Sequence, residues 1–291
     1  MESILAKGLL TNFFEGYNSV ETHWEEVATK VPSTARSENY AWIGSIPRMR
    51  KMKGERVPKK LLEHTYSIVN EEYEASIEVN HADLKDDQTG QYGIQAKSIG
   101  ESAKAFPDEL VFETLLPGGF TGLCYDGQYF FDTDHPIGET GSTQSNKITS
   151  ALDATSFRTA RAMLRKMKDD FGRPTLNRNM DLLLVVPADL EGTAETILEA
   201  ERDSNGATNT LKGKARILVA DWLGDTNNWY LLNVAGIIKP FVVQEREFIP
   251  FEALEEGSES NFMRKKNFYG TYWRGNAGYG LYQKAVGALV A

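Results

Sequence analysis

Residues 47–60 read PRMRKMKGERVPKK, and this segment constrains the fold more than any other part of the chain. It holds seven basic residues against the single acid Glu55, has almost no apolar content, and carries the chain breakers Gly54 and Pro58. Because folding depends on buried apolar surface, such a segment cannot supply a core of its own. We call it the basic tip.

Both flanks of the basic tip have strand character. Residues 39–47, NYAWIGSIP, predict a strand before it. Beyond it, Tyr66 and Ile68 share one face of an alternating pattern, which continues one residue out of phase at Tyr73, Ala75, Ile77 and Val79. A period of two with one slip predicts a strand with a β-bulge. Together these segments predict a long hairpin whose charged end lacks a core.

The charges are unevenly distributed along the chain. Residues 71–87 hold seven acids against Lys85, residues 245–259 hold six glutamates, and the formal net charge of the whole chain is −9. This acidic balance argues against a general nucleic-acid binder, and the basic tip lacks the interleaved aromatic side chains typical of single-strand contacts. As a simple solvated loop, the tip would be unusually long.

A basic tip on an acidic protein favours contact with an acidic surface of another subunit. Each exposed ion pair is worth only about 0.2–1 kcal/mol, but the sum becomes decisive when several contacts repeat over many subunits. The candidate inter-subunit contact residues are Arg48, Arg50, Lys51, Lys53, Arg56, Lys59, Lys60, Glu71, Glu72, Glu74, Glu245 and Glu247.

The composition is that of a soluble globular protein made inside a cell. No run approaches the roughly 18 apolar residues that span a bilayer, and the amino terminus lacks the features of a secretory signal. Cys124 is the only cysteine, which excludes an intrachain disulfide and a thiolate metal cluster. We therefore expect no membrane partner and no cofactor.

Two segments predict helices before the middle of the chain. Residues 1–36 predict an arm with one or two short amphipathic helices. Residues 83–116 predict a helix that Pro107 breaks or restarts, with Asp108 as the cap of the second piece.

The second half of the chain alternates helices and strands. Its clearest helix is 153–171, capped by Asp153 or Thr155 and stopped by Gly172, with an apolar stripe of Phe157, Ala160, Leu164, Met167 and Phe171. A helix at 188–201 follows Pro187, and strands are predicted at 181–187, 215–221, 228–233 and 240–246. This mixed order indicates the α+β fold class.

Residues 130–136, FFDTDHP, allow two interpretations. Asp132, Asp134 and His135 are residue types that bind a divalent ion in hydrolytic enzymes, so a metal-dependent hydrolase is one alternative. The other is a structural turn that ends a strand, anchored by two phenylalanines and formed by Asp132, Asp134, His135 and Pro136. A catalytic centre draws its ligands from several elements, and we therefore favour the turn and predict neither a catalytic residue nor a metal site.

Other enzyme signatures do not occur in the sequence. RGNAGYG at 274–280 lacks the glycine spacing of a dinucleotide-binding loop and predicts a strand that another backbone approaches closely. The phosphate-loop pattern G-x-x-x-x-G-K-[ST] and the nucleophile pattern G-x-S-x-G are both absent. We interpret Cys124 as a buried side chain rather than as half of a Cys–His nucleophile.

Taken in order, the segments resemble the major head subunits of Mu-like bacteriophages over nearly the whole chain. The most specific stretches are YDGQYFFDTDHP, then ARAMLRKMKDDFGRP followed by LLLVVPADLEGTAETIL, and finally FMRKKNFYGTYWRGNAGYGLYQKA. The strand–proline–helix unit at 182–198 is similar to one found in many tailed-phage coat proteins.

The resemblance implies the coat-protein fold typified by phage HK97, in which an extended loop lies over an adjacent subunit. In that fold the hairpin without a core of its own would serve to contact the adjacent subunit. The implied parts are an N-terminal arm at 1–36, an extended loop at 37–80, a first peripheral part with the spine helix at 81–150, an axial domain at 151–245 and a second peripheral part at 246–291.

The resemblance also implies a structural function. It implies a major capsid protein, without enzymatic activity, that assembles with itself into hexamers and pentamers of an icosahedral shell. The shell would enclose double-stranded DNA without sequence-specific binding, and its partners would be a separate scaffold protein, a portal and, in some shells, a decoration protein. The protein would be made and assembled in the bacterial host cytoplasm, and its final location would be the virion. A shell of the same fold that encloses protein cargo is a further alternative.

Overall fold

The computed structural model describes residues 4–40, 66–86, 90–138, 141–169, 172–175, 180–203, 206–255 and 258–290. The basic tip lies outside the described residues, and so do all seven of its contact candidates, Arg48, Arg50, Lys51, Lys53, Arg56, Lys59 and Lys60. The strand predicted at 39–47 is described only as far as Tyr40.

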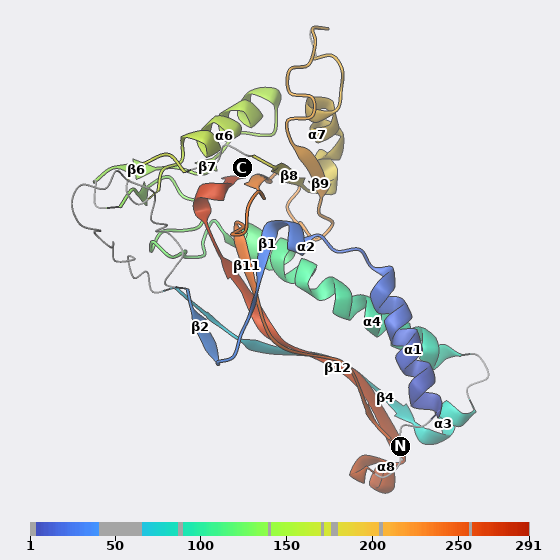
Figure 1. Cartoon of the computed structure of the whole chain (residues 1–291). Coiled ribbons are helices and arrows are strands. Elements are labelled where there is room, and N and C mark those ends of the chain that lie inside the picture. Colours follow the sequence, from blue (N-terminus) through green and yellow to red (C-terminus); the bar gives the residue numbers. More distant parts are fainter. Residues whose placement is uncertain are drawn as a thin grey trace.

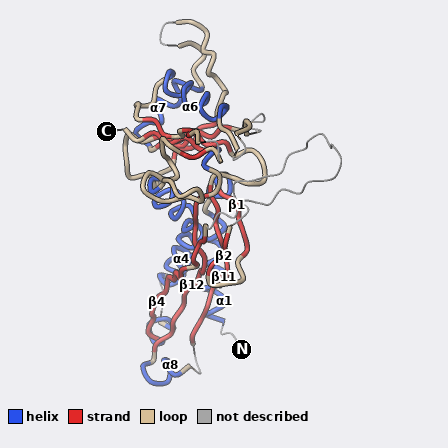
Figure 2. Tube along the Cα trace, turned by 90° about the vertical axis from the view of Figure 1, so that its left-hand side faces the viewer, coloured by secondary structure: helices blue, strands red, loops and turns tan. Residues whose placement is uncertain are grey.

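Two β-sheets divide the described molecule into an elongated part and a compact part (Figure 1). The elongated part is a four-stranded sheet in the order β1 (Ala28–Pro32), β11 (Phe241–Leu254), β12 (Lys266–Tyr279) and β4 (Glu71–Asn80). The compact part is a five-stranded sheet in the order β7 (Lys147–Ile148), β13 (Ala285–Ala288), β10 (Trp229–Asn233), β8 (Leu182–Val186) and β9 (Arg216–Val219). Figure 2 shows the same separation from the side.

Two long helices cover one face of the four-stranded sheet. They are α1 (Ile4–Ser19) and α4 (Gln91–Glu109), which lie along each other and pack on β4, β11 and β12 through Leu9, Val79, Ala96 and Tyr269. The helices approach so closely that a Cβ atom at Gly100 would lie 2.1 Å from the carbonyl oxygen of Phe13. Residues 1–36 do contain two helices, as predicted, but α1 is longer than expected and only α2 (Trp24–Val27) is short.

The prediction that Pro107 breaks the helix was wrong. Helix α4 runs through Pro107 and continues as a π-helical turn (Leu110–Leu115) and then as α5 (Leu116–Gly118). The missing N–H of a proline disturbs the helical ladder, and here the helix widens directly after it instead of ending. Four apolar side chains of the π-helical turn are buried in the core, so tertiary packing outweighs the local cost: Leu110, Val111, Phe112 and Leu115.

Asp108 caps a different helix from the one predicted. Its carboxylate accepts hydrogen bonds from the backbone N–H of Trp24 at 2.7 Å and of His23 at 3.0 Å, where α2 begins. Burial raises the pKa of this carboxyl above its ordinary value, although the two N–H groups oppose the change. Asp108 therefore holds the start of α2 against the end of α4.

Both faces of the five-stranded sheet are buried, which explains the uninterrupted apolar run of β8. Helices α6 (Ala154–Lys166) and α7 (Glu191–Leu198), the latter preceded by a 3-10 turn (Ala188–Leu190), cover one face. On the other face, Leu183, Val185 and Tyr230 pack into the core shared with the four-stranded sheet.

Helix α6 is shorter than the sequence predicts. It ends at Lys166, and Met167 already has an extended backbone. The chain then turns back, because the N–H of Thr175 donates to the carbonyl of Met167 at 2.8 Å and Lys168 forms a β-bridge with Pro174. Phe171, the last member of the predicted stripe, lies outside the described residues.

Asp153 caps α6, and its removal should be measurable. Its carboxylate accepts the N–H of Ser156 at 2.6 Å, and Ser156 Oγ accepts the N–H of Asp153 at 2.9 Å. We expect Asp153→Ala to lower the free energy of unfolding by about 1 kcal/mol, and Asp153→Asn to lower it much less. Urea unfolding of the three proteins at pH 7 checks this, and equal stability of the Ala and Asn variants would contradict it.

The same cap has a pH signature. The hydrogen bonds from Ser156 hold the pKa of Asp153 below its ordinary value. A carboxyl whose pKa is lowered in the folded state contributes stability above its unfolded pKa and loses that contribution as the pH falls through the folded one. The advantage of wild type over Asp153→Ala should therefore shrink below about pH 4.

Two of the places where the chain crosses between the two sheets lie next to each other. Residues 234–240 lead from β10 to β11, and the 3-10 turn Tyr282–Lys284 leads from β12 to β13. The Lys284 ammonium group joins the crossings by donating to the carbonyls of Ala235 and Ile238. Among the described residues, no helix has both the length and the apolar character needed to cross a membrane.

Candidate functional site

The four-stranded sheet has a second face, opposite α1 and α4. Its middle is formed by alternate residues of β4, β11 and β12 that lie side by side in register, such as Glu72, Arg274 and Glu247. We call it the outer sheet face, and it comprises Glu72, Glu74, Glu78, Glu247, Ile249, Glu252, Leu254, Lys266, Phe268, Tyr272 and Arg274.

The outer sheet face carries excess negative charge. Glu72 pairs with Arg274 at 3.5 Å, and Glu78 pairs with Lys266. The remaining glutamates, Glu74, Glu247 and Glu252, form no ion pair with any residue that the structure describes. The face is therefore mixed acidic and apolar, with carboxylates still available for a basic partner.

The register separates the predicted acidic contact residues into two groups. Glu72, Glu74 and Glu247 lie on the outer sheet face. Glu71 and Glu245 are both aligned with Gly275 and lie on the opposite side of the sheet. Glu245 is already occupied there, because it pairs with Lys30 at 2.8 Å and accepts a hydrogen bond from Trp273 Nε1 at 3.3 Å. An irregularity in β11 between Glu245 and Glu247 produces this division, and the sequence gives no sign of it.

The hairpin that carries the basic tip has a well-formed base. It consists of β2 (Ser37–Asn39) and β3 (Ser67–Val69), which pair antiparallel, and the N–H of Tyr40 donates to the carbonyl of Tyr66 at 2.7 Å. The predicted bulge is instead a break at Asn70, because β3 belongs to this hairpin while β4 belongs to the four-stranded sheet. Residues 41–65 thus leave and re-enter the described structure at adjacent points.

The FFDTDHP segment turns between two buried anchors. Phe130 and Phe131 are fully buried, and the Asp132 carboxylate accepts the N–H of Thr133 at 2.7 Å. Asp134 is exposed, whereas His135 is fully buried. Instead of ending a strand, the segment leads into the two-residue strand β5 (His135–Pro136), which pairs with β6 (Thr143–Gln144).

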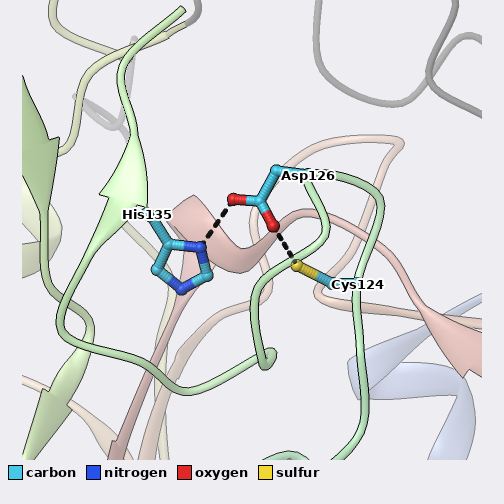
Figure 3. A group of neighbouring side chains, drawn as sticks. All are labelled: Cys124, Asp126 and His135. Atoms are coloured by element: carbon cyan, nitrogen blue, oxygen red, sulfur yellow. Dashed lines mark hydrogen bonds and ion pairs between the residues drawn. The ribbon is translucent and has the colours of Figure 1, made fainter. Parts of the chain in front are cut away.

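His135 belongs to a buried hydrogen-bond cluster, in which Asp126 lies between His135 and Cys124 (Figure 3). Its Nδ1 is 2.7 Å from Asp126 Oδ2, and the Cys124 thiol donates to the other carboxylate oxygen at 2.9 Å. On its other side, Nε2 is 3.1 Å from Asn146 Oδ1, and the ring stacks on Tyr282 with centroids 3.7 Å apart. The cluster fastens the segment 124–146 to the crossing turn between β12 and β13.

These contacts fit a structural support better than a reactive centre. Cys124, Asp126 and His135 offer ligand types within 4.8 Å of one another. Burial, however, raises the pKa of the Cys124 thiol far above its ordinary value, which disfavours the thiolate that a metal ion or a nucleophilic mechanism requires. Burial alone would also raise the pKa of Asp126, but hydrogen bonds from His135, Cys124 and Gln128 outweigh it and lower that pKa.

The residues of the hydrolase alternative do not converge. His135 points inward to Asp126 and Asn146, Asp134 is exposed to solvent, and the Asp132 carboxylate binds backbone N–H groups. The sequence reasoning missed Asp126 and Asn146 as partners of His135. They lie 9 and 11 residues away along the chain, and no local sequence pattern predicts these contacts.

The fold is shared with shell proteins of known structure. A procapsid structure of bacteriophage JBD30 aligns with 99% of this chain and 76% of that chain, with a TM-score of 0.59 and 27% sequence identity. A virus-like particle from Pyrococcus furiosus aligns with 98% of this chain and 100% of that chain, with a TM-score of 0.56, and at 12% identity shows likeness of fold alone. The chain therefore has the α+β, HK97-like fold of a capsid protein.

Sequence comparison identifies the family within this class. The family described as Mu-like prophage major head subunit gpT matches residues 3–151, 145–223 and 224–289. The Mu-like prophage FluMu major head subunit of Haemophilus influenzae is 30% identical over 280 residues, which cover 96% of this chain and 70% of that protein. The major capsid protein of Escherichia phage Mu is 37% identical over 135 residues, 45% of this chain and 44% of that protein.

The chain belongs to the Mu-like major head subunit family, which confirms the resemblance seen in its sequence. It is a major capsid, or head, protein, and its place is the virion capsid. The relatives are structural shell proteins, and neither the hydrolase nor the cargo-shell alternative is favoured by these matches.

Proposed function

We propose that copies of this chain hold each other by laying the basic tip of one subunit across the outer sheet face of a neighbour. The observation that carries the proposal is the charge complementarity between the two. The tip has seven basic residues and one acid, and the face presents three glutamates that no described basic residue pairs with. The apolar side chains among those glutamates, Ile249, Leu254, Phe268 and Tyr272, add contact area.

The energy of such a contact suits a growing shell. A single exposed ion pair contributes about 0.2–1 kcal/mol, so one misplaced subunit can still dissociate. Several pairs per subunit, repeated around a closed lattice, stabilise the finished shell strongly because every subunit is then held by more than one neighbour.

We further propose the form of the assembly. The subunits build hexamers and pentamers of an icosahedral shell that encloses double-stranded DNA, and assembly takes place in the host cytoplasm with a separate scaffold protein and a portal. A decoration protein is a further candidate partner, since a JBD30 capsid is decorated with minor capsid protein trimers. The acidic chain would not bind the packaged DNA tightly, because like charges repel.

The sheets suggest how the chain divides in the shell. We propose the unit built on the five-stranded sheet, mainly residues 151–245, as the axial domain at the capsomer centre. The peripheral domain then comprises most of 81–150 and 246–291, with 1–36 as the arm and 37–80 as the extended loop. Strand β13 lies in the five-stranded sheet beside β10, so the last few residues join the axial unit rather than the peripheral one.

Expression of the chain, alone and with the genes beside it, tests the proposal. We expect closed, hollow particles in sedimentation and electron microscopy, and DNA inside particles from an induced lysogen. A protein that stays monomeric in every combination, and that binds stoichiometric zinc or manganese lost on His135→Ala, would instead support the hydrolase. Particles filled with protein and free of DNA would support the cargo shell.

A further inference from the structure

A buried polar network lies at the base of the hairpin, where an apolar core would be expected. Four segments converge there: the β1–β2 connection, the end of β2, the break between β3 and β4, and the first part of β11. Each contributes a polar side chain that is almost fully buried, namely Ser33, Tyr40, Asn70 and Gln244.

The side chains form one continuous chain of hydrogen bonds. Tyr40 Oη donates to Gln244 Oε1 at 2.8 Å, and Gln244 Nε2 donates to Asn70 Oδ1 at 2.6 Å. Asn70 Nδ2 donates to Ser33 Oγ at 2.8 Å, and Ser33 Oγ donates to Glu38 Oε1 at 2.9 Å. The Glu38 carboxylate also accepts the backbone N–H groups of Thr34 and Ala35, which close the turn before β2.

The network accepts only one arrangement of its amides. Gln244 Nε2 uses its second hydrogen on the carbonyl of Ile68 at 3.3 Å, and Asn70 Nδ2 uses its second on the carbonyl of Ala35 at 2.8 Å. Because the backbone neighbour of each amide nitrogen is a carbonyl, which can only accept, turning either amide over would set its oxygen against that carbonyl oxygen. The donor-to-acceptor direction of these hydrogen bonds therefore fixes the relative placement of the four segments, in addition to their packing.

The hairpin base also rests tightly on β12. A Cβ atom at Gly278 would lie 2.4 Å from the Ile68 side chain, and the N–H of Tyr279 donates to Tyr66 Oη at 2.8 Å. Asn276 Nδ2 donates to the carbonyl of Val69 at 2.9 Å. These contacts hold the hairpin base against β12, while the polar network holds it against β11.

We propose that Tyr40, Gln244 and Asn70 are positioning residues for assembly: they set the direction in which residues 41–65 leave the body, and so determine where the basic tip meets the neighbouring subunit. The network touches no partner itself and acts through the hairpin base. This inference rests on the proposed contact between tip and neighbour, and it assigns the geometry of that contact to a buried network that contains no residue of the tip itself.

The variants Tyr40→Phe and Gln244→Met test the inference. Tyr40→Phe removes one hydroxyl and keeps the ring, and Gln244→Met keeps the length of the side chain without its amide. We expect both subunits to fold, and the yield of closed shells to fall at least fivefold, with open sheets or irregular particles in their place. Tyr40→Phe keeps the test valid if Gln244→Met does not fold.

A matched control separates positioning from stability. Val286→Ala removes two methyl groups from the core of the compact part, away from the hairpin base. The variants are compared at equal stability of the folded subunit, which small changes in the temperature or denaturant concentration of the assembly reaction adjust. Under these conditions the control should form normal shells while the network variants do not. The inference would be overturned if the network variants, at the same stability as the control, form shells of the same yield and shape as the control does. Wild-type protein that forms no shells, or tip variants that assemble normally, would instead overturn the proposed function.

Discussion

We expect that reversing Arg48, Arg50, Lys51 and Lys53 to glutamate will abolish shell assembly and leave the subunit folded. The four changes convert the basic tip into an acidic one, which must then approach the acidic outer sheet face of a neighbour. Each contact changes from about 0.2–1 kcal/mol of attraction to a comparable repulsion, and the change repeats at every subunit. Folding should be spared because the tip has almost no apolar content to contribute to a core.

Sedimentation of assembly reactions and circular dichroism of the subunits measure the two outcomes. A charge-preserving control, with the two arginines changed to lysine and the two lysines to arginine, should assemble. Reversal of Glu74, Glu247 and Glu252 to lysine should impair assembly on its own and partly restore it when combined with the acidic tip. Salt should weaken wild-type assembly, since charges more than about 8 Å apart are screened at physiological ionic strength. Normal shells from the acidic-tip variant would show that the tip is not an interface element.

We expect that replacing His135 with alanine will strongly destabilise the subunit without changing its metal content. The change leaves the Asp126 carboxylate buried without the imidazole 2.7 Å away, and it removes the stacking on Tyr282. Losing one partner of a buried pair costs about 3–5 kcal/mol. For a chain of this size, that loss corresponds to a fall of roughly 5–8 °C in melting temperature.

Thermal unfolding of His135→Ala beside His23→Ala provides the measurement. His23 is the matched control, because its pairing with Glu26 at 3.3 Å is partly exposed, so its loss should cost less than about 1 kcal/mol. The lowered pKa of Asp126 predicts the pH dependence: its contribution is present above the unfolded pKa and disappears as the pH falls through the folded one. The difference between wild type and His135→Ala should thus narrow below about pH 4. A His135→Ala protein as stable as the control would refute the supporting role.

Local patterns predicted local structure well. The stripe Phe157, Ala160 and Leu164 identified α6, and the apolar run Leu182–Val186 identified a strand buried on both faces. The glycines of RGNAGYG indicated close packing, and a Cβ at Gly275 would lie 2.2 Å from the carbonyl oxygen of Gln244. In each case the spacing of residues along one element determines what that element buries.

Long-range contacts account for what the sequence did not predict. Pro107 stays inside a helix because the residues after it are buried, and Asp108 caps a helix more than 80 residues earlier in the chain. The sequence showed the slip in the alternating pattern after Ile68, but it did not show the cause. At Asn70 the chain passes from the hairpin to the four-stranded sheet, and the Asn70 side chain bonds to Gln244, 174 residues away. Likewise, only the register of β11 and β12 shows that Glu247 faces outward while Glu245 does not.

The most direct test of the central claim is a reconstruction of the assembled shell by electron cryomicroscopy, at a resolution that traces the chain. The account predicts residues 41–65 of one subunit lying over the outer sheet face of the next, with basic side chains beside Glu74, Glu247 or Glu252. Density that places this segment against its own subunit, or over a neighbouring surface without acidic residues, would contradict it.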